Sequence, residues 1–167
     1  MIRTPIDEFV RSARAQGIVL DSGVALLHFL GSYDRQLLRK VSRAAIFADE
    51  DVDTLARLLQ LFKTVALTPH ILTEVINLLG NLHDPARTGL LSAIHRPLAT
   101  IQEDYQPSAE LARDPLFPRL ELTDTAVVAL ARRGYGVLTI DGQLYAELLR
   151  DNRAVLNFNH VRTWAWR

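Results

Sequence analysis

Short runs of apolar, often β-branched residues alternate along the chain with longer segments whose apolar positions recur every three or four residues. The short runs are typical of buried parallel strands, and the longer pattern is typical of amphipathic helices. We expect strands at 17–21, 64–67, 135–140 and 154–158, with a further extended piece at 98–102. We expect helices at 5–16, 22–30, 34–43, 51–62, 69–79, 123–133 and 143–150, and a helical stretch that begins at residue 84.

Cap and turn residues set the expected ends of these helices. Thr4-Pro5 and Thr68-Pro69 each place a hydroxyl at a helix N-cap and a proline at the first helical position. Glycines are expected to end the helices that precede them, at Gly17, Gly31, Gly80 and Gly134. Prolines interrupt the segment 107–120, which is therefore expected to be broken.

Strands that alternate with helices predict an α/β fold, in which helices cover both faces of a mainly parallel central sheet. The length of 167 residues suits a single domain that spans 1–167. In such sheets, ligands bind beyond the carboxyl ends of the strands, where the strand order reverses. The residues at those strand ends are therefore the first candidates for function.

The expected strand ends are rich in carboxylates. Asp21 closes the first strand and Asp141 follows the strand at 135–140, while Glu74 lies inside helix 69–79 and Asp124 opens helix 123–133. The segment 124–141 holds one helix, a glycine turn and a returning strand, so its two ends are expected at the same edge of the sheet. All four acids can therefore meet in one cleft.

Four unpaired carboxylates in one cleft repel one another and raise one another's pKa. No Lys or Arg lies within five residues of Asp21 or Glu74. A hard divalent cation, Mg²⁺ or Mn²⁺, relieves this repulsion because it prefers oxygen ligands and retains part of its water shell. Such a site suits metal-assisted hydrolysis of a phosphodiester bond. The same crowding predicts that neutralising Asp21 stabilises the metal-free fold.

Each acid also has an ordinary structural interpretation. An aspartate after a strand often caps the next helix or forms a turn, which applies to Asp21, Asp124 and Asp141-Gly142. For Glu74, the alternative is a solvated helix face.

Some polar and aromatic residues near the acids or the chain end are weaker candidates. His70 and Asn77 share a helix face with Glu74. His70 could orient a substrate phosphate or be a polar residue without a catalytic part, and Asn77 could bond Glu74 or a water. Trp164 and Trp166 could stack on bases or pack against the body or a partner subunit.

The composition excludes several classes of protein. The chain has no cysteine, which excludes thiol catalysis, Cys-ligated zinc, iron–sulfur clusters and disulfide scaffolds. No apolar run approaches the roughly 18–20 residues that span a bilayer, so no membrane partner is expected. Acidic residues come early, at Asp7-Glu8, where a secretion signal is apolar, and this favours a cytoplasmic location.

The charge balance bears on nucleic-acid binding. With 19 basic and 19 acidic residues the net charge is zero, which argues against binding by bulk electrostatics. A local patch is still expected, because Arg35, Arg39, Lys40 and Arg43 form a basic stripe on the predicted helix 34–43. Beside an acidic metal site this stripe could hold an RNA backbone, and the alternative is a solvated helix face.

Four segments, taken in order, resemble the motifs of a PIN domain: 19–22, 69–77, 122–126 and 137–141. The resemblance covers roughly residues 18–160. It implies a three-layer α/β/α sandwich, here with an extra N-terminal helix and a helical insertion at about 31–63. It also implies a nuclease that depends on Mg²⁺ or Mn²⁺ and usually acts on RNA. Its catalytic, metal-binding quartet maps onto Asp21, Glu74, Asp124 and Asp141.

The resemblance extends to neighbouring positions and has departures. Ser22 matches the hydroxyl beside the first acid, and Thr139 the hydroxyl before the last. Gly23 stands where the family often has Asn or Ser, which could weaken the positioning of water or metal. The segment 31–63 makes the chain longer than the compact VapBC-type toxins. RNA is the expected substrate, with an antitoxin protein or a second copy of the chain as further candidate partners.

Two alternatives from other classes stay open. One is a phosphotransfer or dehalogenase-like enzyme with Asp21 as nucleophile. That chemistry usually needs a second Asp nearby and a neutralising Lys, whereas Ser22-Gly23-Val24 follows Asp21 and the only lysines are Lys40 and Lys63. The other is a PIN-like binding or dimerisation module without catalysis, whose expected mark is the loss of one or more of the acids.

Overall fold

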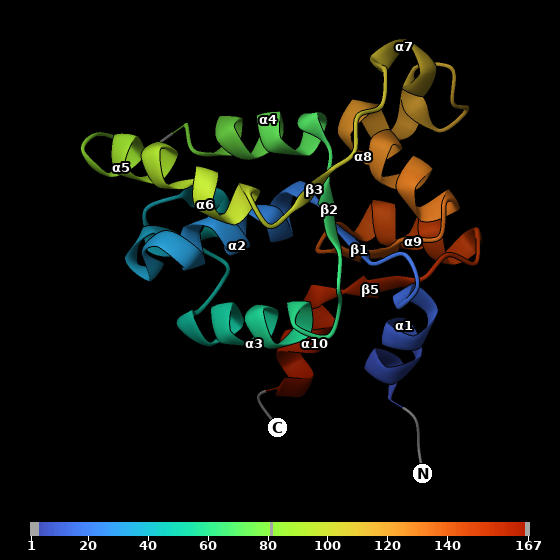
Figure 1. Ribbon diagram of the computed structural model, residues 1–167, viewed down its shortest axis with the longest axis horizontal. Coiled ribbons are helices and arrows are strands. Elements are labelled where there is room, and N and C mark those ends of the chain that lie inside the picture. The colour runs from blue at the N-terminus through green and yellow to red at the C-terminus, as the bar shows by residue number, and fades with distance from the viewer. Residues whose placement is uncertain (1–3, 81, 166–167) are drawn as a thin grey trace.

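Five short strands form one sheet in which every pairing is parallel, as the computed structural model shows (Figure 1). The structure describes residues 4–80 and 82–165. The strands are β1 Ile18–Leu20, β2 Val65–Leu67, β3 Gln102–Glu103, β4 Gly136–Thr139 and β5 Val155–Asn157. Their order is β3-β2-β1-β4-β5. The chain builds outward from β1 to β3 and then returns to β4, so the strand order reverses between β1 and β4.

The two central strands are apolar because they are covered on both faces. Every residue of β1 and β4 is buried, and the register pairs Val19 with Val137 and Leu20 with Leu138. Such continuous apolar runs are typical of parallel strands between two helical layers. The register places the residues that follow β1 beside the end of β4, at the edge where ligands bind in this class of sheet.

Helices cover both faces of the sheet, which gives the expected three-layer α/β/α sandwich. The helices are α1 Pro5–Ala13, α2 Ser22–Tyr33, α3 Asp49–Leu59, α4 Pro69–Leu78, α5 Ala86–Ala93, α6 His95–Leu98, α7 Ser108–Leu111, α8 Phe117–Arg132, α9 Gly142–Arg150 and α10 Phe158–Ala165. Crossovers between parallel strands are right-handed, so the outward and returning connections lie on opposite faces. Both α2 and α8 pack against β1 and β4. Of the helices in the described ranges, none combines the length and the apolar character that crossing a bilayer requires.

The helix starts predicted from Thr4-Pro5 and Thr68-Pro69 are confirmed. Three of the four predicted glycine stops are also confirmed, because α1, α4 and α8 end shortly before Gly17, Gly80 and Gly134. The Thr4 hydroxyl accepts a hydrogen bond from the Asp7 amide, and the Thr68 hydroxyl accepts one from the Ile71 amide. Gly17 and Gly134 follow their helices with φ values of 103° and 96°. The expected stop at Gly31 is wrong, because α2 continues to Tyr33. Gly31 serves close packing instead, since a Cβ there would lie 2.6 Å from Val52 of α3.

The predicted helix 34–43 is also wrong. The segment forms two 3₁₀ turns, η1 Arg35–Arg39 and η2 Ser42–Ala44. The buried residues of this segment, Leu37, Leu38, Val41 and Ala44, fit an α-helical spacing as well, so the apolar pattern does not reveal the 3₁₀ turns. In a 3₁₀ helix the residues that share a face are three apart. Basic residues four apart in this segment therefore do not share one face.

Three further elements differ from expectation. The extended piece predicted at 98–102 is displaced, because residues up to Leu98 complete α6 and β3 covers Gln102–Glu103. The helix predicted at 123–133 starts earlier, at Phe117, and is interrupted at Glu121, whose φ of 61° and ψ of −175° are not helical. The chain after β5 forms α10, which the apolar pattern did not predict.

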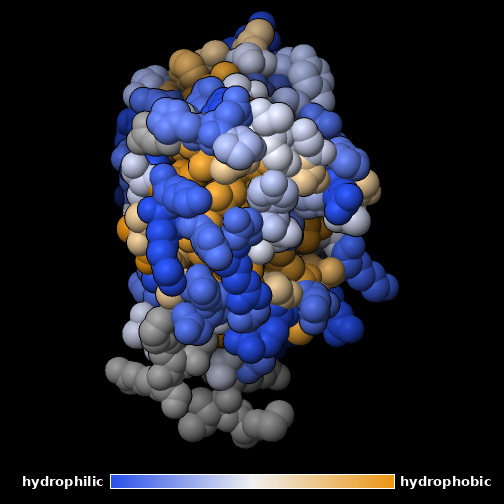
Figure 2. Space-filling model, turned by 90° about the vertical axis from the view of Figure 1, so that its left-hand side faces the viewer, coloured by the Kyte–Doolittle hydropathy of each residue, from blue (hydrophilic) through white to orange (hydrophobic). Residues whose placement is uncertain are grey.

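The face seen in Figure 2, which is the left-hand side of Figure 1, carries hydrophilic side chains around an exposed apolar strip. A hollow of about 440 Å³ lies between α2 and the α5–α6 segment, with Phe29, Tyr33 and Ile94 among its walls. None of its lining residues is acidic. The size of a hollow therefore does not by itself locate the acids, which lie elsewhere.

Candidate active site

A pocket of about 340 Å³ lies beyond the carboxyl ends of β1 and β4, and all four predicted acids line it. The acids come from four parts of the chain, because two follow strands and two lie on α4 and α8, which pack side by side (Figure 1). The complete lining is Asp21, Ser22, Gly23, Ser42, Arg43, Ile46, Glu74, Leu78, Asp124, Ile140 and Asp141. The structure thus brings together side chains that are up to 120 positions apart in the sequence.

Asp21 is held at the end of β1 by hydrogen bonds to both of its carboxylate oxygens. It is the N-cap of α2, where Oδ1 accepts from the Val24 amide at 2.7 Å. Its Oδ2 accepts from the Ile140 amide at 2.9 Å and from the Thr139 hydroxyl. Burial raises the pKa of Asp21, and these hydrogen bonds oppose the rise. Asp21 is therefore a structural link between the ends of β1 and β4 as well as a candidate ligand.

Asp141 has the same kind of support at the end of β4. It is the N-cap of α9, with Oδ1 accepting from the Leu144 amide at 2.7 Å. Its own amide donates to the Thr139 hydroxyl oxygen at 2.8 Å. Thr139 therefore joins the two aspartates, since it also donates to Asp21. The capping role considered for Asp21 and Asp141 is real, and it directs both carboxylates to the same edge of the sheet.

Glu74 and Asp124 are held much less. On α4, Glu74 Oε1 accepts one hydrogen bond from the Ser22 hydroxyl at 3.0 Å. On α8, the Asp124 carboxylate receives no hydrogen bond from any described residue, and the helix break at Glu121 shows that Asp124 does not cap its helix. Burial raises the pKa of Asp124 to about 7, and the charges of Asp141, Asp21 and Glu74 add to the rise.

Gly23 has a steric explanation. A Cβ at this position would lie 2.6 Å from the Ile140 side chain. Ile140 lines the pocket between the end of β4 and Asp141, so it fills the space that a larger residue at position 23 would need. The departure from the PIN motif at Gly23 is thus matched by a branched apolar side chain across the pocket.

The four basic residues predicted to hold RNA are placed differently from one another. Arg35 pairs with Asp53 at 2.6 Å, and Arg39 lies 4.0 Å from Asp49. Lys40 is exposed and does not line the acidic pocket. Arg43 does line it, together with the four acids. The expected continuous stripe is wrong because the segment is not an α-helix, and Arg43 alone among the four reaches the acids.

The weaker candidates lie beside the pocket or beyond the described side chains. His70 and Asn77 line an adjoining hollow of about 310 Å³ that shares Glu74 with the acidic pocket. His70 Nε2 lies 3.0 Å from the Ser108 hydroxyl, and no hydrogen bond joins Asn77 to Glu74. The side chain of Trp164 and the whole of Trp166 lie outside the described part of the chain.

The carboxylate oxygens of the pocket are the candidate ligands for a divalent cation. Within residues 4–80 and 82–165, no three or more His, Asp or Glu side chains are arranged to hold a metal ion as they stand. Glu74 Oε2, Asp141 Oδ2 and both Asp124 oxygens nevertheless accept no hydrogen bond from described residues. These are the hard oxygen ligands that Mg²⁺ and Mn²⁺ prefer. The chemistry of the donors fits such an ion, and coordination requires side chains of the pocket to move from their present positions.

The geometry argues against Asp21 as a nucleophile. Asp21 is only 3% exposed, and both of its carboxylate oxygens accept hydrogen bonds. Neither Lys40 nor Lys63 lines the pocket. A covalent phosphotransfer role for Asp21 therefore lacks both access and a neutralising lysine.

Known proteins give no match for this chain, either among models of protein families or among curated sequences. The function must therefore be inferred from the pocket itself.

Proposed function

We propose that the protein is an endoribonuclease of the PIN type that hydrolyses RNA with Mg²⁺ or Mn²⁺ in the carboxylate pocket. One observation carries this proposal: four carboxylates, two at the ends of β1 and β4 and two on α4 and α8, line a single pocket where the strand order reverses. Burial raises the pKa of Asp124 to about 7, and the charges of the other acids add to the rise. Carboxylates gathered without paired cations are typical of sites that bind a divalent metal.

The chain's own residues have distinct tasks in this proposal. Glu74, Asp124 and Asp141 would hold the ion through carboxylate oxygens that lack hydrogen bonds, together with Asp21. When bound, the ion would polarise the phosphate and lower the pKa of the attacking water. Thr139 and Ser22 position Asp21 and Glu74, respectively. No covalent intermediate with the protein is required.

Arg43 supplies the positive charge for the substrate. It lines the acidic pocket and makes no ion pair with a described residue, whereas Arg35 and Arg39 are occupied by Asp53 and Asp49. A guanidinium is well suited to phosphate oxygens because it offers several donors in a fixed plane. We assign to Arg43 the backbone phosphate next to the cleaved bond.

The test is cleavage of a mixed single-stranded RNA pool with millimolar Mg²⁺ or Mn²⁺ by wild type and by Asp141→Asn. The amide keeps an acceptor for the Leu144 amide, so the cap of α9 is preserved while the ligand charge is lost. Asp53→Asn, which lies outside the pocket, is the matched control. We expect cleavage by wild type and control, none by Asp141→Asn, and none in EDTA. Cleavage that persists in EDTA, or equally in Asp141→Asn, contradicts the proposal.

A further inference from the structure

A second hollow, of about 470 Å³, opens directly beside the acidic pocket and shares Glu74 and Asp124 with it. Its other walls come from one stretch at the start of α8: Phe117, Pro118, Leu120, Glu121, Leu122 and Thr123. We name this hollow the flanking pocket. Its volume lies in the range of about 300–1,000 Å³ that is usual for pockets that bind small organic groups. A group bound there lies next to whatever the four acids act on.

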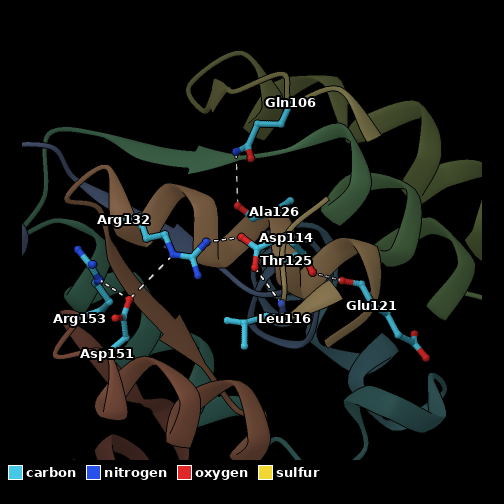
Figure 3. Close-up of polar contacts among 9 residues, drawn as sticks. All are labelled: Gln106, Asp114, Leu116, Glu121, Thr125, Ala126, Arg132, Asp151 and Arg153. Atoms are coloured by element: carbon cyan, nitrogen blue, oxygen red, sulfur yellow. Dashed lines mark hydrogen bonds and ion pairs between the residues drawn. The ribbon is translucent and has the colours of Figure 1, made fainter. Parts of the chain in front are cut away.

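Polar contacts fix the wall of the flanking pocket, and Figure 3 shows those of Asp114 with Leu116 and Arg132. Asp114 accepts from the Leu116 amide at 2.9 Å and forms an ion pair with Arg132. Arg119 forms an ion pair with Glu147 of α9 at 3.1 Å. These contacts hold the chain on both sides of Phe117, so its half-buried ring has a defined place in the wall.

Glu121 lies in this wall with an unusual backbone. Its φ of 61° and ψ of −175° are a conformation that residues other than glycine rarely adopt. The Thr125 hydroxyl donates to the Glu121 carbonyl at 2.5 Å and helps to hold this conformation. Figure 3 shows the Glu121 side chain running away from the Asp114–Arg132 network. Glu121 is an exposed residue that lines the flanking pocket, and its carboxylate accepts no hydrogen bond from a described residue.

The charges of the flanking pocket select the kind of group that fits. Glu74, Glu121 and Asp124 line it, and none of its lining residues is basic. A phosphate there would be repelled, whereas a neutral nucleobase would not. Phe117 also lines the pocket, and aromatic side chains bind nucleobases by stacking.

We propose that the flanking pocket binds the nucleobase next to the cleaved phosphate, with Phe117 stacking on it and Glu121 accepting hydrogen bonds from its amino group. This inference rests on the proposed function, because it takes the substrate to be RNA. Cytosine, adenine and guanine carry an exocyclic amino donor, and uracil does not. A carboxylate acceptor favours the amino-bearing bases. Glu121 is then the residue that disfavours uracil beside the cleavage site.

The experiment has a cleavage arm and a binding arm. Oligonucleotides that vary one flanking base at a time are cleaved by wild type, Phe117→Ala, Phe117→Leu and Glu121→Gln. We expect the two Phe117 variants to lose about tenfold in kcat/KM for every base, because an apolar side chain without a ring cannot stack. We expect Glu121→Gln to lose most of the discrimination against uracil, which is about fivefold or more in wild type. Tyr105→Ala, which alters an aromatic that is 75% exposed, is the control.

The binding arm follows the backbone amide signals of 117–124 by NMR, with CMP, GMP and UMP as probes and no metal. We expect shifts with CMP and GMP, weaker shifts with UMP, and no shifts in Phe117→Ala. If wild type cleaves RNA without base preference and Phe117→Ala cleaves it equally well, the nucleobase proposal is overturned and the nuclease proposal stands. Shifts at 117–124 in a protein that cleaves no RNA support the pocket as a nucleobase site and overturn the nuclease. If the protein shows neither amide shifts nor RNA cleavage, both the nucleobase proposal and the nuclease proposal are overturned.

Discussion

The two aspartates at strand ends and the two acids on helices line the same pocket but are held in different ways. Asp21 and Asp141, which we name the strand-end pair, accept backbone N–H bonds as the caps of α2 and α9. Glu74 and Asp124, which we name the helix pair, receive between them one hydrogen bond from described residues, from Ser22. The strand-end pair is therefore part of the fold. The helix pair carries charge that the protein itself leaves almost uncompensated.

This difference has an energetic consequence. A buried carboxylate that accepts hydrogen bonds recovers part of the solvation that it loses, and one without them does not. Asp21 accepts bonds from the amides of Val24 and Ile140 and from Thr139, whereas Asp124 has no such partner and faces three other acids. Neutralising one member of each pair is thus expected to change stability in opposite directions. The sequence-based prediction that Asp21→Asn stabilises the metal-free fold is in line with the burial that raises the pKa of Asp21. We expect the loss of its hydrogen bonds to outweigh that gain.

The largest effects are predicted for two variants, Asp21→Asn from the strand-end pair and Asp124→Asn from the helix pair. Both variants are expected to lose RNA cleavage by about 100-fold or more, since each removes a charged ligand. Asp21→Asn should lower the free energy of unfolding by about 1–3 kcal/mol, because an amide group would face the Ile140 or Val24 amide. Asp124→Asn should raise the free energy of unfolding by about 1–2 kcal/mol at pH 8 without metal, because it removes an unpaired charge.

Urea unfolding in EDTA measures both stability changes. Asp53→Asn, an exposed acid paired with Arg35, is the control and should change stability by less than about 1 kcal/mol. A loss of stability in Asp124→Asn that equals the loss in Asp21→Asn would show that the two pairs are held alike, and the comparison would fail.

The sequence contains more information about the strand-end pair than about its surroundings. Buried parallel strands appear as apolar runs, so the ends of β1 and β4, and with them Asp21 and Asp141, can be predicted from the sequence. The alternation of strands and helices likewise predicts the layered α/β fold. Glu74 and Asp124 follow once their helices are placed, because α4 and α8 begin near the same edge of the sheet.

Features that depend on tertiary packing could not be predicted in this way. Residues 35–44 have the charges and the buried positions of an amphipathic α-helix, and only the packed structure shows that they form two 3₁₀ turns. Gly31 has the appearance of a helix stop, and its true constraint is the approach of Val52 from a later helix. The backbone at Glu121 is strained, and a propensity argument predicts no such conformation for a glutamate.

Thr139→Val sharpens the comparison by removing the hydroxyl that joins the strand-end pair. The substitution keeps the shape but leaves the Asp141 amide without its acceptor and Asp21 without one donor. We expect a loss of about 2 kcal/mol in the free energy of unfolding and a fall of about tenfold in cleavage. Thr54→Val in α3, also buried but remote from the pocket, is the control for cleavage and should cleave as wild type does. Unchanged cleavage in Thr139→Val would remove its positioning role.

The pH dependence of the free energy of unfolding reports on Asp124 of the helix pair. The pKa of Asp124 is about 7 in the folded protein, against 3.8 for the ordinary side chain. Between these values the folded state binds more protons than the unfolded state, so the free energy of unfolding falls as pH rises from about 4 to about 7. We expect this decline to reach about 1–2 kcal/mol. It should be smaller in Asp124→Asn, where the raised pKa of Asp21 still contributes a decline of the same sign.

A divalent metal ion should offset this loss of stability at pH values at which the acids are ionised. At pH 8, millimolar Mg²⁺ or Mn²⁺ is expected to raise Tm by about 3–6 °C, because the ion binds the folded state alone. At pH 5 the rise should be smaller, because protons compete for the ligands. An equal rise at both pH values, or the same rise in Asp124→Asn, would place the ion outside the carboxylate pocket.

Ser22→Ala is expected to have the smallest effect and probes the single hydrogen bond of the helix pair. The Ser22 hydroxyl donates to Glu74 Oε1 at 3.0 Å in a partly buried setting. Its loss should change the free energy of unfolding by no more than about 1 kcal/mol, since the freed carboxylate oxygen can still reach water. Cleavage should fall by less than about tenfold, and higher Mg²⁺ should restore it, because the bond only restricts a side chain that the metal also orients. Ser12→Ala, whose hydroxyl bonds the Glu8 carbonyl on α1, is the matched control. A loss of cleavage in Ser22→Ala as large as that in Thr139→Val, and not restored by Mg²⁺, would mean that Glu74 is fixed by the fold as firmly as Asp21.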